Sequence, residues 1–296
     1  MSDLTASIIS SAPLAGLGFL PDLNTLLLVR WPLIAIGVVL LIRLLFPRSK
    51  TTAWQFVSEL LIIIPAFLAY FLVRKVVEGR VSEAFSNGAK VIELERAVGI
   101  FWEPRLQEHI LDFDLLVNLA NWVYMWGHWP VIVLAAVWLF LMHRDAYHVY
   151  RNAFLISGAI GLIIFAAFPV APPRFMEAWG FVDTVAENSS GYRVLQPPAF
   201  VNQYAAMPSL HFGWNLLVGV AIARYGSVPL LRLFGALMPA AMFVGIVLTA
   251  NHYIIDGLAG GGLALLGLVT AIMLRRLYER GREADTGNLP GLAAPS

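Results

Sequence analysis

The 296-residue chain contains no cysteine, and only 13% of its residues are charged. Without cysteine the chain can form neither a disulfide bond nor a thiolate metal site. Soluble domains carry about 25% charged residues, whereas 59% of this chain is hydrophobic. A soluble fold is therefore excluded, and a multi-spanning membrane protein is expected. The formal net charge of only +1 argues against a nucleic-acid-binding protein.

Long apolar runs predict an all-α fold, a polytopic membrane helix bundle, because one span needs about 20 apolar residues. Residues 1–25 have no basic region ahead of an apolar core, so they do not resemble a cleaved signal peptide. They are expected to form an N-terminal extracytoplasmic segment, followed by a membrane domain at 26–275 with its core at 115–275, and by a disordered cytoplasmic tail at 276–296. Seven spans are predicted, with six as the second count because the first two are less well defined: 26–46, 55–73, 118–142, 152–170, 207–224, 230–249 and 253–274.

Basic residues gather in the short connections on one side of the predicted bundle, whereas the longer connections on the other side, 74–117 and 171–206, balance bases with acids. Positive charge in short loops marks the cytoplasmic side. The C-terminus is therefore predicted to be cytoplasmic, and the N-terminal ends of the fifth and seventh spans to be extracytoplasmic, as in a plasma-membrane protein. The basic residues are Arg48, Lys50, Arg144, Arg151, Arg224, Arg232, Arg275, Arg276, Arg280 and Arg282.

Segment 88–114 mixes apolar and charged residues and is not apolar enough for a span. This pattern predicts an interfacial amphipathic helix that lies in the plane of the lipid headgroups. It would act there as a lid or a lipid guide, although a simple packed loop helix fits the pattern equally well. The segment 171–206 is rich in proline, glycine, serine and asparagine, which predicts an ordered loop above the membrane.

Two histidines lie at the edges of apolar stretches, where ionisable residues are rare and costly. His211 ends the segment Met-Pro-Ser-Leu-His, and His252 is followed four residues later by Asp256. On a helix that spacing places the imidazole and the carboxylate on one face. A carboxylate that accepts a hydrogen bond from one imidazole nitrogen fixes the tautomer and leaves the other nitrogen as a lone pair. The pattern therefore indicates a histidine nucleophile with an orienting carboxylate.

The segment before His211 supports a second chemical role. Pro208 suits the first turn of a helix, and Ser209 can cap that helix or donate a hydrogen bond to an anion. Backbone N–H groups at a helix start bind phosphate well. His211 itself can protonate a leaving oxygen and later deprotonate an acceptor hydroxyl. The two motifs together therefore indicate phosphoryl chemistry.

These motifs resemble a known family. Residues 207–211 and 252–260 are similar to the second and third motifs of the type 2 phosphatidic acid phosphatase superfamily. Phe-Pro-Val-Ala-Pro-Pro-Arg at 168–174, together with Glu95 and Gly-Ile-Phe-Trp-Glu at 99–103, resembles the branch that includes inositol phosphorylceramide synthase. The resemblance covers about 90–275.

The resemblance implies a catalytic membrane domain and a role for each matching residue. His252 would attack phosphorus and become phosphohistidine, Asp256 would orient and polarise it, and His211 would protonate the leaving group. The family needs no metal and no cofactor. The substrate would be a lipid phosphate or phospholipid that enters sideways between helices, with its phosphate at the interface.

The chain also departs from the phosphatase pattern. The usual first motif, a lysine followed seven residues later by Arg-Pro, is absent upstream, and Ile246 stands where the third motif usually has an arginine. Two phosphate-binding cations are thus missing, and charge-assisted contacts to a dianionic monoester are strong. Their loss favours a diester or pyrophosphate-like substrate. Arg174 and Arg193 are expected to take over phosphate binding, together with Ser209.

Three functions remain open at this point. Transfer of a phospho-headgroup, inositol phosphate by resemblance, to or from a lipid is preferred. A lipid phosphate phosphatase acting on phosphatidic acid or on a polyprenyl phosphate or diphosphate is the first alternative. The second is a proton-coupled transporter or flippase whose histidines relay protons, although transporters usually place polar sites near the bilayer midplane.

Overall fold

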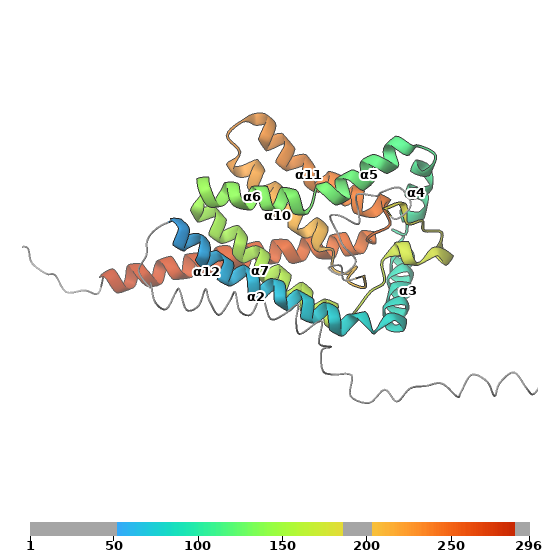
Figure 1. The fold of residues 1–296 in the computed structure, drawn as a ribbon, viewed down its shortest axis with the longest axis horizontal. Coiled ribbons are helices and arrows are strands. Elements are labelled where there is room, and N and C mark those ends of the chain that lie inside the picture. The colour runs from blue at the N-terminus through green and yellow to red at the C-terminus, as the bar shows by residue number, and fades with distance from the viewer. Residues whose placement is uncertain (1–51, 186–202, 288–296) are drawn as a thin grey trace, which may run out of the picture. The chain divides into compact units, whose positions relative to one another are not determined.

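The structure is a computed structural model that describes residues 52–185 and 203–287. The predicted first span, the N-terminal segment 1–25 and Arg193 lie outside the described residues. The chain divides into two compact units, Met1–Ala69 and Tyr70–Ser296, and their boundary falls within helix α2 (Thr52–Glu78). The described residues confirm the all-helical prediction, since they contain no strand beyond an isolated parallel bridge between Val170 and Ala205 (Figure 1).

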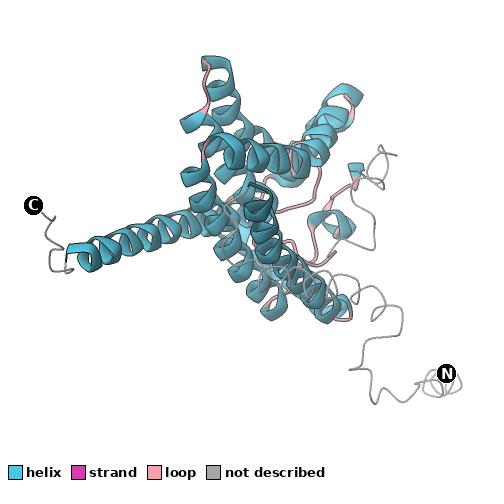
Figure 2. Cartoon of the chain, turned by 60° about the vertical axis from the view of Figure 1, so that its left-hand side comes forward, coloured by secondary structure: helices cyan, strands magenta, loops and turns pink. Residues whose placement is uncertain are grey.

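The second unit contains every remaining candidate residue. Figure 2 shows its described part as helices joined by loops, with the long last helix leading to the C-terminal end. Two short 3₁₀ turns, η1 (Pro173–Phe175) and η2 (Glu177–Trp179), follow helix α7. The helices in chain order are α3 (Val81–Val98), α4 (Glu103–Leu111), α5 (Asp114–Trp126), α6 (Trp129–Met142), α7 (Arg144–Ala167), α10 (Leu210–Tyr225), α11 (Pro229–Leu248) and α12 (Ile254–Gly287).

In the part of the chain that the structure describes, fewer helices are long and apolar enough to cross a membrane than the six or seven predicted for the whole chain. Within the described residues there are three, α7, α11 and the part Ile254–Glu283 of α12, or four if the bent pair of α5 and α6 counts as one span. Helix α10 has 16 residues, so it extends over about 24 Å, less than the ~30 Å of hydrocarbon core. Helix α2 carries only a shorter apolar stretch, Val57–Val73. These apolar helices still indicate an integral membrane protein.

Glycine and proline break two segments that the sequence predicted as single helices. The predicted span 118–142 is bent by 42° between α5 and α6, where Gly127 ends one helix and a proline begins the next. The predicted amphipathic helix 88–114 is divided at Gly99, whose φ of 77° ends α3 in the left-handed conformation. Glycine adopts that conformation without a steric penalty. The predicted single helix is therefore two helices, α3 and α4.

Two further helices are longer than predicted. Helix α7 begins at Arg144, so the predicted cytoplasmic loop before residue 152 is already helical. The tail predicted to be disordered from residue 276 continues α12 as far as Gly287. In both cases charged residues extend a helix whose apolar part alone was recognised, because arginine and glutamate are good helix formers.

Helix α10 packs against both α11 and α12, and α7 runs along α12 (Figure 1). A Cβ atom at Gly219 of α10 would overlap the carbonyl oxygen of Gly235 in α11. Small residues of this kind let membrane helices approach closely. Large apolar side chains on α6, α7, α11 and α12 are exposed, as expected for contact with lipid. Among them are Leu134, Met142, Ile163, Leu230, Leu274 and Leu277.

Candidate active site

His252 lies in the tight connection between α11 and α12. Helix α11 ends at Leu248, and the backbone N–H group of His252 donates to the carbonyl of Ile246 at 3.1 Å. Ala250 within this turn has a φ of 52°, which only a minority of non-glycine residues adopt. The side chain of His252 is buried, with 5% of its surface exposed. The turn therefore holds the imidazole inside the protein at the start of α12.

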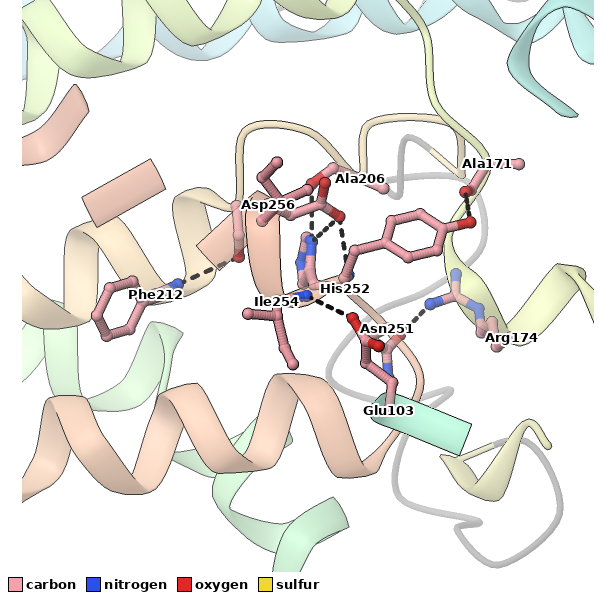
Figure 3. Close-up of polar contacts among 12 residues, drawn as sticks. Glu103, Ala171, Arg174, Ala206, Phe212, Asn251, His252, Ile254 and Asp256 are labelled. Atoms are coloured by element: carbon pink, nitrogen blue, oxygen red, sulfur yellow. Dashed lines mark hydrogen bonds and ion pairs between the residues drawn. The ribbon is translucent and has the colours of Figure 1, made fainter. Parts of the chain in front are cut away.

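The tautomer of His252 is fixed by a backbone carbonyl. Its Nδ1 atom lies 2.8 Å from the carbonyl oxygen of Ala206 (Figure 3). Because a carbonyl can only accept, Nδ1 carries the proton and Nε2 is left with a lone pair. Burial lowers the pKa of His252 to about 3, so the ring is neutral at pH 7. This is the form in which an imidazole acts as a nucleophile.

Asp256 lies beside His252 without a direct hydrogen bond to it. Its Oδ2 atom is 3.6 Å from Nδ1 of His252, beyond hydrogen-bond length, and accepts instead the backbone N–H of Tyr253 at 3.0 Å. The hydrogen bond expected between these side chains is thus made to the Ala206 carbonyl. Asp256 is completely buried, and it places a carboxyl group close to the ring without making a tautomer-fixing contact.

The Ala206 carbonyl reaches His252 because two loop segments pair. The N–H of Val170 donates to the carbonyl of Tyr204 at 2.9 Å, and the N–H of Ala206 donates to the carbonyl of Val170 at 3.2 Å. The proline-rich segment that contains Val170 therefore aligns the chain just before α10. Sequence reasoning missed Ala206, since a backbone acceptor has no signal in its residue type.

His211 faces His252 from the first turn of α10, with 5.5 Å between the ring centroids. Its Nε2 atom is buried and has no hydrogen-bond partner among the described residues. Ser209 caps the helix, as its Oγ accepts the N–H of Phe212 at 3.4 Å. Ser209 also donates its own N–H to the Asp256 carbonyl at 2.9 Å. The sequence had suggested Pro208 for the first turn of this helix, but Pro208 lies before the cap.

An aromatic stack supports His211 on its other side. The centroid of its ring lies 4.1 Å from the ring centroid of His128 and 4.8 Å from that of Tyr124. The side-chain amide of Asn215 donates to Nδ1 of His128 at 3.1 Å and to the His211 carbonyl at 2.9 Å. His128 was not predicted to lie at the site. The bend at Gly127 brings it to the site, and only the adjacent glycine and proline hinted at that bend.

Arg174 is the predicted phosphate ligand that the structure places near the histidines. Its guanidinium donates to Oδ1 of Asn251, and its backbone N–H donates to the carbonyl of Ala250 at 2.7 Å. The side chain is buried, and its Nε atom lies 3.6 Å from a carboxylate oxygen of Asp183. Arg174 is thus fixed to the turn that carries His252, and its charge is partly neutralised. Arg193, which was also predicted to bind phosphate, lies outside the described residues.

No metal centre accompanies this arrangement in the described ranges 52–185 and 203–287. Nowhere in them do three or more histidine, cysteine, aspartate or glutamate side chains converge in a way that could hold a metal ion.

Gly260 provides the close contact between the starts of α10 and α12. A Cβ atom at this position would overlap the carbonyl oxygen of Ser209. Alanine at position 260 is expected to lower unfolding stability by about 1–3 kcal/mol, as overpacking does, and to reduce activity at least 10-fold by displacing the cap of the His211 helix. Thermal unfolding in detergent and initial rates check this. The control is Gly262→Ala, since nothing lies within 4 Å of a Cβ there; equal behaviour of the two variants would contradict the prediction.

A known protein family matches the part of the chain that contains both histidine motifs. The sequence model of the PAP2 superfamily matches residues 89–270, a range that includes His211, His252 and Asp256. No curated protein and no solved structure matches the chain. Members of this superfamily are typically phosphatases or phosphotransferases, and the narrower branch suggested by residues 168–174 is not distinguished by the match. Since the match covers more than half of the sequence and contains both histidine motifs, the chain belongs to the PAP2 superfamily.

Proposed function

We propose that this protein is a membrane enzyme that transfers a phospho-headgroup to or from a lipid through a phosphohistidine on His252. The observation that carries the proposal is the neutral, buried imidazole of His252. Its Nδ1–H is held by the Ala206 carbonyl, and the ring of His211 lies 5.5 Å away. A nucleophile and an acid–base group thus stand next to each other, as covalent phosphoryl transfer requires.

In the first step, the lone pair on Nε2 of His252 attacks phosphorus. The bond from phosphorus to the leaving oxygen breaks, and His211 gives that oxygen a proton. The positive charge that develops on the His252 ring is stabilised by the Asp256 carboxylate, 3.6 Å from Nδ1. In the second step, His211 takes a proton from an acceptor hydroxyl, whose oxygen attacks phosphorus. The phosphorus–nitrogen bond breaks, and neutral His252 is restored.

The charge of the site favours a phosphodiester over a phosphate monoester. Arg174 is the candidate cation in the described residues, and Asp183 at 3.6 Å offsets part of its charge. A diester carries one negative charge, whereas a monoester carries up to two and would be better matched by further cations. Transfer between lipids is therefore preferred, with inositol phosphate suggested as headgroup by the resemblance of residues 168–174. Ser209 is fully buried as a helix cap. It would therefore assist phosphate binding indirectly, by holding the start of α10 in place.

Two alternatives use the same observations differently. Hydrolysis of phosphatidic acid or of a polyprenyl phosphate or diphosphate needs only water in place of the acceptor hydroxyl. A proton-coupled transporter or flippase would use the histidines as a relay. It is less well supported, because the histidines lie at the ends of α10 and α12 and not in the middle of a helix.

The location proposed for the site is the extracytoplasmic face of the plasma membrane, with the C-terminus in the cytoplasm. The basis is the excess of arginine in the short connections. Helices α3 and α4 would lie in the headgroup plane next to the site. Their exposed apolar side chains support this placement: Leu94, Val98, Trp102 and Leu106.

The test is a product analysis with purified protein. Phosphatidic acid, a polyprenyl diphosphate and an inositol-containing phosphodiester lipid are each incubated with and without an acceptor lipid hydroxyl, and products are identified by mass spectrometry. Headgroup transfer that requires the acceptor supports the proposal. Release of inorganic phosphate alone would establish the phosphatase alternative. Movement of unaltered lipid across a proteoliposome membrane would instead favour a transporter.

Arg174→Ala is expected to raise KM about 10- to 100-fold and to change kcat less. The reason is that one charge-assisted hydrogen bond to an anion is worth about 1.5–3 kcal/mol. Steady-state kinetics with the active lipid measures both constants. Arg105→Ala removes an exposed arginine of α4 and serves as the control. A wild-type KM in the Arg174 variant would remove this residue from the substrate site.

A further inference from the structure

Two glutamates that the mechanism above does not use are completely buried beside the site. Glu95 lies on α3 and Glu103 on α4, and both have 0% exposure. Carboxylates are almost never fully buried unless they are paired. Their position in amphipathic helices makes the burial more notable, because the same helices expose apolar side chains on other faces.

Both carboxyl groups bind the start of α12. Glu103 Oε1 accepts the backbone N–H of Ile254 at 2.9 Å, and Glu95 Oε1 accepts that of Ile255 at 2.8 Å (Figure 3 shows the Glu103 contact). Asp256 Oδ2 accepts the preceding N–H, that of Tyr253. Three consecutive N–H groups directly after His252 thus each bind a different carboxyl group. The first N–H groups of a helix need such acceptors and favour negative charge.

This arrangement has a consequence for where the substrate phosphate binds. Because carboxyl oxygens already occupy the N–H groups at the start of α12, that helix end is closed to an anion. The start of α10, which carries His211, and the guanidinium of Arg174 remain for phosphate. The glutamates therefore act on the peptide that carries His252 and do not contact the substrate.

The second oxygen of each carboxyl group does not bind α12. Glu95 Oε2 and Glu103 Oε2 are both buried and have no hydrogen-bond partner among the described residues. Burial, and then the neighbouring carboxyl group of Glu103, raise the pKa of Glu95 to about 9. Two neighbouring buried carboxyl groups do not both ionise at neutral pH. The charged or titratable groups that face Glu95 are Glu103 from α4 and Asp256 and Tyr253 from the start of α12.

We infer that Glu95 and Glu103 form a carboxyl clamp that fixes the first turn of α12 and so positions His252 and Asp256 for phosphoryl transfer. The inference rests on the proposed function of His252. The clamp ties the catalytic turn to two helices that are remote in sequence and expose apolar side chains. Its members are positioning residues, since they touch the backbone behind the nucleophile.

Alanine at position 95 or 103 is expected to lower kcat about 100-fold and to leave KM within about 3-fold, because geometry at phosphorus is lost while Arg174 is kept. Glu95→Gln should recover most of the loss, to within about 10-fold of wild type. Its amide oxygen can accept the Ile255 N–H, and its amide group is neutral, as the protonated acid is. The matched controls are Glu93→Ala on α3 and Glu108→Ala on α4, since both side chains are exposed.

The pH profile separates positioning from a purely structural role. Glu95 is neutral below pH about 9 and gains a negative charge above it, so wild-type kcat should fall on the alkaline side as a buried negative charge appears next to the first turn of α12. Glutamine at position 95 has no proton to lose, and this alkaline fall should disappear from the profile.

The outcomes distinguish the two proposals. A wild-type protein without phosphoryl chemistry on any lipid of the panel overturns the proposed function itself. An active wild type with unchanged kcat in a folded Glu95→Ala variant overturns the clamp. Folding is judged by thermal unfolding in detergent; if the alanine variants do not fold, Glu95→Gln decides, and an alkaline fall identical to that of wild type refutes the inference.

Discussion

An alanine in place of His252 is expected to abolish turnover, with kcat lower by about 10⁶-fold, the loss seen when a covalent nucleophile is removed. The physical reason is that, in the proposed mechanism, His252 forms the covalent bond to phosphorus, while His211 has the separate task of moving protons. The measurement is the rate of product formation from the lipid identified by mass spectrometry.

Phosphorus on His252 can be detected directly. Wild-type protein incubated briefly with labelled substrate and denatured in base should carry an acid-labile label, whereas His252→Ala should carry none. His109→Ala replaces an exposed histidine of α4 and should behave as wild type. Turnover that persists in the His252 variant would show that phosphorus passes to the acceptor without a histidine adduct.

Replacing Asp256 by asparagine is expected to lower kcat about 10³-fold and to leave KM nearly unchanged. The amide oxygen can still accept the Tyr253 N–H, so the local backbone is preserved. What is lost is the carboxyl group that, in the proposed mechanism, carries a negative charge 3.6 Å from Nδ1 of His252. At an effective dielectric constant of about 20, a charge pair about 4 Å apart is worth about 4 kcal/mol, which corresponds to this factor in rate.

This experiment also distinguishes two possible roles of Asp256: stabilising a positive charge on His252 and fixing the His252 tautomer. In serine protease triads the carboxylate fixes the histidine tautomer, and its loss leaves the wrong one. Here the Ala206 carbonyl holds Nδ1–H whether or not position 256 is charged. Asp112→Asn changes an exposed carboxylate and is the control. A kcat within 3-fold of wild type in the Asp256 variant would mean that the developing positive charge is stabilised elsewhere.

Several features of the site follow from local sequence. His252 and Asp256 are four residues apart at a helix start, so their side chains lie together wherever the helix packs. The two histidine motifs carry the superfamily resemblance, which the match to residues 89–270 confirms. The helix breaks at Gly99 and Gly127 were harder to predict. Both glycines lie within longer segments that were predicted as single helices, and a single glycine does not always end a helix.

The sequence by itself determined the membrane class, the all-helical fold and the superfamily, and it singled out His211, His252 and Asp256 as candidate site residues, because composition, apolar run length and helical spacing are local properties. Only the tertiary structure decided what holds His252. The Ala206 carbonyl is 46 residues from His252, and Glu95 and Glu103 lie 160 and 151 residues from the N–H groups that they bind. Such contacts depend on how helices pack in space, and a backbone acceptor or a buried glutamate on an amphipathic helix looks, in sequence, like any other.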